Sequence, residues 1–184
     1  MNPTILITGG CRSGKSSHAL TLASQINGRR KLFVATCVAG DEEMRARVLR
    51  HQRERGDDWQ TIEEPADLVE VIQRRGPGAD LMLVDCLTLW VSNLLVNNPE
   101  EAAFLNTLDR LGRSIGQPPC PLIFVTNEVG AGIVPENALA RRFRDFTGWV
   151  NQRVAAACDT VIWMVAGIPV TIKPRMDAAS GRQD

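Results

Sequence analysis

The feature that most constrains the fold is a glycine-rich segment near the N-terminus. It reads Gly9-Gly10-Cys11-Arg12-Ser13-Gly14-Lys15-Ser16 and fits the pattern GxxxxGK followed by Ser or Thr. The apolar run Thr4–Thr8 precedes it, and helix-forming residues follow from Ser16 to Ile26. Between a strand and a helix, such a loop turns its backbone N–H groups around phosphate oxygens at the positive end of the helix. The segment therefore predicts a P-loop nucleotide-binding domain, with a chance glycine-rich turn as the alternative.

The chemistry of this loop assigns roles to individual residues. Lys15 would place a positive charge near the β- and γ-phosphates, and the hydroxyl of Ser16 would bind Mg²⁺. Asp85 ends an apolar run, where an acidic residue commonly holds the metal or its water shell in P-loop enzymes. A helix N-cap is the other interpretation of Asp85. We favour Ser16 and Asp85 as the metal-binding pair.

The rest of the chain alternates apolar strands with helical patterns. Strands are expected at Thr4–Thr8, Leu32–Thr36, Leu81–Asp85, Leu122–Thr126, Thr160–Ala166 and Val170–Ile172. Helices are expected at Ser16–Ile26, Asp41–Arg55, Ala66–Arg74, Leu87–Val96, Pro99–Ile115 and Pro135–Cys158, with Gly148 as a point where the last could break. This alternation predicts an α/β fold with a mostly parallel sheet covered by helices on both faces. We expect one domain over residues 1–184, with a loose polar tail at 175–184.

Four strand ends carry residues suited to a ligand. They are Gly9–Ser16, Thr36-Cys37, Asp85 and Asn127-Glu128. In an open parallel sheet, ligands bind at the carboxyl ends of the strands. The sequence therefore places these segments at one site and favours a substrate or catalytic role for Asn127 and Glu128. The glycines around them, Gly130 and Gly132, are equally consistent with a simple tight turn.

Composition argues against several other classes of protein. Lys and Arg together number 21, as do Asp and Glu, so the net charge is zero. This balance disfavours a chain that coats nucleic acid or acidic membranes. The five cysteines form no CxxC pair, which disfavours a zinc site or a disulfide framework and suggests reduced thiols in the cytoplasm. No apolar run approaches the roughly 18 residues of a membrane span.

One histidine lies among arginines. His51 belongs to a charged segment that continues with Gln52, Arg53, Glu54 and Arg55. A solvated helix explains such a segment well. A neutral imidazole can also attack an α-phosphorus and form a covalent nucleotidyl-histidine. Nearby positive charge would favour the neutral imidazole and stabilise the pentavalent phosphorus. The residues alone do not decide between these alternatives.

Taken together, several segments resemble one enzyme family. They are Gly9–Ser16, Ala35-Thr36, His51 with Trp59–Glu63, Val84–Leu95, Thr126–Pro135, Phe143–Asp145 and Asn151-Gln152. The chain resembles the bifunctional adenosylcobinamide kinase/adenosylcobinamide-phosphate guanylyltransferases of cobalamin biosynthesis over about residues 4–173. The segment around Asn127-Glu128-Val129-Gly130 is the most distinctive part of the resemblance, since the P-loop alone is far less specific.

The resemblance implies two reactions. ATP or GTP, with Mg²⁺, phosphorylates a hydroxyl of adenosylcobinamide, and GTP then donates GMP through a guanylyl-histidine to give adenosylcobinamide-GDP. By position, the nucleophile is His51. The resemblance also implies a RecA-like fold, a homotrimer, and guanine-nucleotide contacts by Ala35, Thr36, Cys37, Gln52, Arg53, Glu54, Arg55, Glu63 and Asp85. Cys11 replaces the alanine common in the family, and Asp85 stands where some members have glutamate, so whether Asp85 binds metal or guanine stays open.

Three other functions compete with this interpretation. A monofunctional P-loop small-molecule kinase would need the P-loop and Mg²⁺ but not His51. A RecA-like ATPase on single-stranded DNA would need a basic groove with aromatic residues, which zero net charge and 5% aromatic content disfavour. A signalling GTPase would carry an NKxD motif, and the sequence contains none.

Overall fold

The protein forms one seven-stranded sheet in a computed structural model that describes residues 2–37, 58–96 and 100–175. The strand order is β3-β2-β4-β5-β1-β6-β7. The strands are β1 (Thr4–Gly9), β2 (Lys31–Ala35), β3 (Trp59–Glu63), β4 (Leu81–Asp85), β5 (Leu122–Val125), β6 (Thr160–Val165) and β7 (Ile168–Lys173). Neighbouring strands run parallel except for the final pair, β6 and β7, which form an antiparallel hairpin at one edge.

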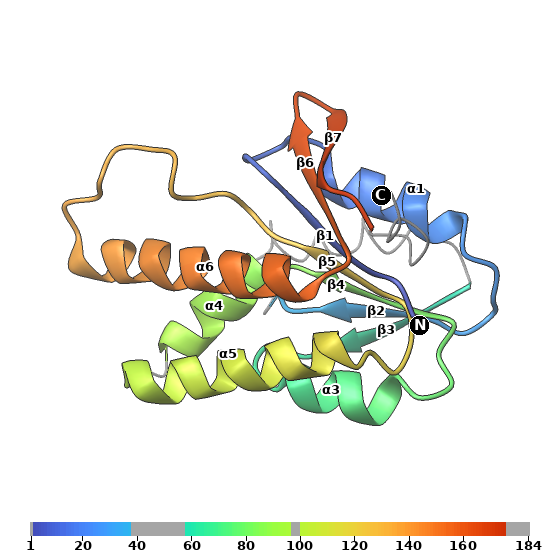
Figure 1. The fold of residues 1–184 in the computed structure, drawn as a ribbon. Helices are drawn as coiled ribbons and strands as arrows, with labels where there is room; N and C mark the ends of the chain where they lie inside the picture. The colour runs from blue at the N-terminus through green and yellow to red at the C-terminus, as the bar shows by residue number, and fades with distance from the viewer. Residues whose placement is uncertain (1, 38–57, 97–99, 176–184) are drawn as a thin grey trace, which may run out of the picture.

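Helices cover both faces of this sheet, as the alternating pattern predicts. The helices are α1 (Lys15–Ser24), α3 (Leu68–Arg75), α4 (Leu87–Val96), α5 (Glu101–Gly116) and α6 (Ala138–Ala157). Figure 1 shows α3, α4, α5 and α6 on one face and α1 on the other. The strands between these layers are buried on both sides, which explains why they read as continuous apolar runs.

Two apolar clusters hold the layers together. The larger contains inward side chains of α3–α6, including the fully buried Trp90 and the pair Phe104–Phe146, whose tilted rings have centroids 4.2 Å apart. The smaller lies on the α1 face, where Ala19 and Ala23 are fully buried against the sheet. Small alanine side chains let α1 approach the strands closely, which brings its N-terminus to the strand ends.

The structure departs from the sequence predictions at three places. β3, at Trp59–Glu63, was not predicted, because it is a half-exposed edge strand with polar residues in its sequence. Helix α6 continues through Gly148 without a break. Helix α1 ends at Ser24, with its C-cap on Gln25, whereas the predicted helix extended to Ile26. The helix predicted at Asp41–Arg55 lies outside the described residues. All the other predicted helices and strands are present.

Two further expectations stay predictions. These are the single domain over residues 1–184 and the loose tail at 175–184, of which residues 176–184 lie outside the described part of the chain. Within the described part of the chain, none of the helices has the length and apolar character needed to cross a membrane.

Candidate active site

The P-loop joins β1 to α1 in a conformation that depends on glycine. Gly14, directly before α1, has φ 92°, and Gly9, at the end of β1, has φ 149°. A Cβ on Gly9 would lie 2.5 Å from the backbone oxygen of Met164. The loop is also tied to the β6–β7 turn, because the Gly167 N–H donates to the Ser13 carbonyl at 3.1 Å. The sequence pattern predicts the loop correctly but gives no sign of this support.

Lys15 begins α1 and folds back over the loop. Its Nζ donates to the Gly10 carbonyl at 2.6 Å and to Ser13 Oγ at 3.4 Å, and the side chain is only 7% exposed. Burial lowers the pKa of Lys15, and the negative charges of Cys86, Cys11 and Asp85, in order of decreasing effect, oppose the shift. Such a desolvated ammonium group gains most from a phosphate that replaces its internal acceptors.

Asp85 lies at the end of β4 beside the P-loop, as the strand pattern predicts. Its influence on the pKa of Lys15 shows that the two side chains are close in space. Ser16, in the first turn of α1, offers a hydroxyl on the same face of the sheet. A hydroxyl and a carboxylate oxygen suit Mg²⁺, which usually takes one or two protein oxygens and completes its shell with water and substrate phosphates. The donors present therefore fit a magnesium ion bound together with a nucleotide.

The residues implied as nucleotide contacts line up across the sheet. Glu63 on β3 is in register with Ala35 on β2, and Ala35 is in register with Asp85 on β4. Register partners of parallel strands point to the same face, so these residues form a row beside α1. Thr36 is fully buried, and its hydroxyl accepts from the Cys86 N–H at 2.9 Å and donates to the Cys86 carbonyl at 2.7 Å.

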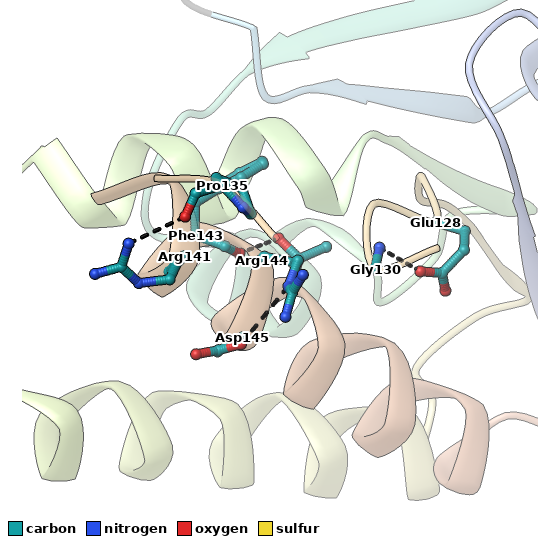
Figure 2. Close-up of polar contacts among 8 residues, drawn as sticks. Glu128, Gly130, Pro135, Arg141, Phe143, Arg144 and Asp145 are labelled. Atoms are coloured by element: carbon teal, nitrogen blue, oxygen red, sulfur yellow. Dashed lines mark hydrogen bonds and ion pairs between the residues drawn. The ribbon is translucent and has the colours of Figure 1, made fainter. Parts of the chain in front are cut away.

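Asn127 and Glu128 follow β5 and lie next to the P-loop. The Glu128 N–H donates to the Gly9 carbonyl at 3.0 Å, which continues the β1–β5 pairing beyond the strands. The Glu128 side chain is exposed, and its Oε1 accepts from the Gly130 N–H at 2.6 Å (Figure 2). The structure thus brings together four of the predicted strand ends, at Gly9–Ser16, Thr36-Cys37, Asp85 and Asn127-Glu128.

The arginines at the start of α6 hold local structure. Arg141 donates from one guanidinium nitrogen to the carbonyl oxygens of Pro135 at 3.0 Å and Glu136 at 2.6 Å, as Figure 2 shows for Pro135. Arg142 lies over the Phe146 ring at 5.0 Å. Arg144 lies 4.0 Å from Asp145. The Arg141 bonds shape the connection between the Glu128 loop and α6, whereas the contacts of Arg142 and Arg144 lie within α6 itself.

The remaining predicted site residues cannot be placed. His51, Gln52, Arg53, Glu54 and Arg55 all lie outside the described residues.

Two polar residues that sequence reasoning did not single out, Thr88 and Asn93, lie close to the site on α4. The Asn93 side chain donates to the carbonyl oxygens of Thr36 at 2.7 Å and Pro65 at 3.1 Å, which joins the ends of two loops. No local pattern marks such residues, because their partners are distant in sequence.

Comparisons with known proteins agree with this geometry. Residues 5–172 match the model of the family described as cobinamide kinase / cobinamide phosphate guanyltransferase. The chain is 40% identical to the bifunctional adenosylcobalamin biosynthesis protein CobP of Pseudomonas aeruginosa, over 91% of this chain and 96% of that protein. It is 42% identical to the bifunctional adenosylcobalamin biosynthesis protein CobU of Salmonella typhimurium, over 92% of this chain and 99% of that protein.

Solved structures support the same fold. The flagellar accessory protein FlaH of Methanocaldococcus jannaschii superposes with a TM-score of 0.54 at 14% identity, covering 94% of this chain and 79% of that one. The ATPase domain of G40P superposes with a TM-score of 0.53 at 11% identity, covering 95% and 78%. At these identities the likeness concerns the fold alone, which is that of RecA-like ATPases.

Proposed function

The chain belongs to the cobinamide kinase / cobinamide phosphate guanyltransferase family, and from this premise we propose that it catalyses both reactions on adenosylcobinamide. The observation that carries the proposal is a family match that spans residues 5–172 and therefore includes every segment of the candidate site. The convergence of Gly9–Ser16, Asp85 and Asn127-Glu128 at one edge of the sheet supports it.

In the first reaction, a hydroxyl oxygen of adenosylcobinamide attacks the γ-phosphorus of ATP or GTP. The bond to the β-phosphate breaks, and a nucleoside diphosphate leaves. Lys15 and the loop N–H groups would hold the β- and γ-phosphates, so positioning and charge supply most of the catalysis. Ser16 and Asp85 would hold Mg²⁺, which neutralises charge on the phosphates.

In the second reaction, an imidazole nitrogen of His51 attacks the α-phosphorus of GTP, and pyrophosphate leaves. A phosphate oxygen of adenosylcobinamide phosphate then attacks the same phosphorus. The P–N bond breaks, which releases His51 and forms adenosylcobinamide-GDP. A covalent intermediate divides one difficult displacement into two in-line steps. The row of Glu63, Ala35 and Asp85, with Thr36, Cys37 and Gln52–Arg55, would contact the guanine nucleotide.

Asn127 and Glu128 would act on the corrinoid substrate. They lie at the same edge of the sheet as the P-loop but on a separate loop, where an acceptor could approach the phosphates. The exposed Glu128 carboxylate is suited to accept a hydrogen bond from the acceptor hydroxyl. Movement of the His51 segment toward the P-loop would let one nucleotide site serve both reactions.

Assembly as a homotrimer and a cytoplasmic location complete the proposal. The β6–β7 hairpin exposes apolar side chains that a neighbouring subunit could cover, namely Trp163, Val165, Ile168, Val170 and Ile172. Exposed apolar surface of this kind commonly marks an interface. The reduced thiols expected from the cysteine pattern suit the cytoplasm.

A monofunctional P-loop kinase or a RecA-like ATPase is the alternative, and product analysis separates the functions. The wild-type protein, incubated with Mg²⁺, GTP and adenosylcobinamide, should yield adenosylcobinamide-GDP by mass spectrometry. His51→Ala should stop at adenosylcobinamide phosphate, and Lys15→Ala should lose the phosphorylation itself. If His51→Ala forms the GDP adduct as fast as wild type, the transferase mechanism is wrong.

A further inference from the structure

A closed ring of hydrogen bonds begins and ends on the backbone of Asn127. The Asn127 N–H donates to Thr88 Oγ1 at 2.7 Å, and Thr88 Oγ1 lies 3.3 Å from Thr126 Oγ1. The Thr126 hydroxyl donates to Asn151 Oδ1 at 2.7 Å, and Asn151 Nδ2 donates back to the Asn127 carbonyl at 3.1 Å. Because Thr126 donates to Asn151, the Thr88 hydroxyl is the donor to Thr126. Each hydroxyl in the ring has one donor partner and one acceptor partner within it, and Thr88 also contacts the Cys86 thiol.

The ring supplies hydrogen-bond partners to the chain after β5 at the point where the neighbouring strand β4 has ended. β5 lies between β4 and β1, and the last β4 pair joins Asp85 to Val125. On the β1 side, the N–H groups of Thr126 and Glu128 still pair with Ile7 and Gly9. Since successive residues of an extended chain point their N–H groups to opposite edges, Asn127 faces the side that β4 has left. Thr88 of α4 and Asn151 of α6 take the place of the missing strand.

Burial makes this ring rigid. Thr126 is fully buried and Thr88 is 6% exposed. Breaking a hydrogen bond of either hydroxyl would therefore leave a buried polar group with no partner and no water to replace it. Hydrogen bonds in a closed, buried chain also strengthen one another. The loop after β5 is thus fixed from one side by the P-loop and from the other by two helices.

The ring leaves the side chain of Asn127 uncommitted. Within the described residues, hydrogen bonds to Asn127 involve its backbone N–H and carbonyl, and its half-exposed amide takes part in none. An asparagine whose backbone is held by other side chains can direct its own amide at a ligand. Because such a group is already ordered, it loses little conformational entropy when it binds a ligand.

We propose that Asn151 is a positioning residue for the cobinamide-dependent steps, acting through Thr126 and Thr88 to hold Asn127 and Glu128 against the corrinoid acceptor. This inference rests on the proposed function and extends it to residues that act through the backbone of Asn127. It predicts a selective defect: attack by the acceptor should suffer, whereas formation of the guanylyl-enzyme from GTP should not.

The test separates the half-reactions in the full-length enzyme. Asn151→Leu removes both bonds of the amide, and Thr88→Val removes the acceptor for the Asn127 N–H. In both variants we expect kcat/KM for adenosylcobinamide and its phosphate to fall by about 10- to 100-fold, the effect of misplacing a substrate-positioning group by about 1 Å. Pyrophosphate release from GTP without corrinoid should stay within about 2-fold of wild type, an effect of only about 0.4 kcal/mol. Thr88→Ser keeps the hydroxyl and should restore most of the activity.

Thr147→Val is the matched control for lost stability. Thr147 is also fully buried on α6, but its hydroxyl bonds to the Phe143 carbonyl of the same helix at 2.7 Å. Thr147→Val should lower the stability of the fold without a selective loss of kcat/KM for adenosylcobinamide and its phosphate. Equal losses in both half-reactions, or no loss in Asn151→Leu and Thr88→Val, would overturn the inference. A wild-type enzyme that forms no guanylyl-enzyme would instead overturn the proposed function, and this inference with it.

Discussion

At the scale of single residues, four of the five thiols fall into two contrasting environments. Cys11 is exposed in the middle of the P-loop. Cys86, Cys120 and Cys158 are buried, and burial raises the pKa of Cys86 and Cys120 to about 11 and that of Cys158 to about 12. Since the thiolate is the reactive form, burial and the raised pKa values both disfavour reaction of these three thiols, whereas Cys11 is accessible.

This difference gives a direct probe of nucleotide binding. Iodoacetamide at pH 8 should alkylate Cys11 well before the three buried thiols, as followed by peptide mass spectrometry. Nucleotide with Mg²⁺ would cover the loop, so concentrations of about 10 times Kd or more should slow alkylation of Cys11 by roughly 10-fold. Alkylation of Cys11 at an unchanged rate under saturating nucleotide would contradict the placement of phosphate on this loop.

Sequence reasoning correctly predicted the positions in the fold of the candidate residues whose signal is local. The P-loop has its own pattern, and Asp85 and Asn127-Glu128 directly follow apolar strands. It did not find the ring through Thr88, Thr126 and Asn151, whose members are separated by 38 and 25 residues along the chain. Threonine and asparagine in a helix are ordinary surface residues until the fold shows which backbone groups they face.

At the scale of elements, α6 shows where a residue preference is overruled by its neighbours. Gly148 disfavours a helix by itself, yet α6 continues from Ala138 to Ala157 because Phe146, Val150 and Val154 bury one face. β3 is a strand that the sequence did not predict. Its polar residues do not favour a strand by themselves, yet it forms because the edge of β2 is open for pairing. Both errors arise because packing, not local preference, decides the outcome.

Gly148→Ala tests this account of α6. A Cβ on Gly148 would meet no atom within 4 Å, and the residue has helical surroundings. The substitution should therefore raise the free energy of unfolding by about 0.5–1 kcal/mol, because alanine loses less backbone entropy than glycine. Urea unfolding followed by circular dichroism measures the change. A lower stability would mean that the position needs glycine.

Gly14→Ala is the opposing comparison in the P-loop. Its φ of 92° lies in a region that alanine avoids, and a Cβ there would lie 3.4 Å from the Gly167 Cα. We expect a loss of about 1–2 kcal/mol in the free energy of unfolding, the cost of a left-handed conformation for a residue with a Cβ. Stability equal to wild type would argue against this loop conformation.

At the scale of the whole molecule, the alternation of strands and helices was enough to predict the architecture but not the strand order. The order β3-β2-β4-β5-β1-β6-β7 depends on which edges meet, and nothing local specifies that. The position of the candidate site nevertheless follows from this strand order. β1 lies between β5 and β6 in the sheet, which places the P-loop between the Asn127 loop and the β6–β7 turn.

The buried thiols also make global stability depend on alkaline pH. In the unfolded chain thiols ionise near pH 9, whereas in the folded protein Cys86, Cys120 and Cys158 hold their protons to about pH 11–12. The unfolded state therefore binds fewer protons in this window, and the free energy of unfolding should fall as the pH rises above 9. Each thiol contributes a slope of up to about 1.4 kcal/mol per pH unit.

Urea titrations at about pH 7.5, 9.5 and 10.5, chosen on either side of the unfolded-chain thiol pKa near 9, measure this dependence. A Cys120→Ala/Cys158→Ala variant should show a shallower decline than wild type, whatever its stability at neutral pH. Identical slopes in the two proteins would mean that these thiols are not the groups responsible.

The central claim is that one chain both uses the P-loop and forms a covalent guanylyl-enzyme. The most direct measurement is incubation with Mg²⁺ and GTP labelled at the α-phosphorus, followed by denaturation and a test for bound label, with His51→Ala alongside. The account predicts label that survives alkali, is lost in acid and is absent from the variant. Folded, nucleotide-binding protein that takes up no label, or label that persists in His51→Ala, would contradict it.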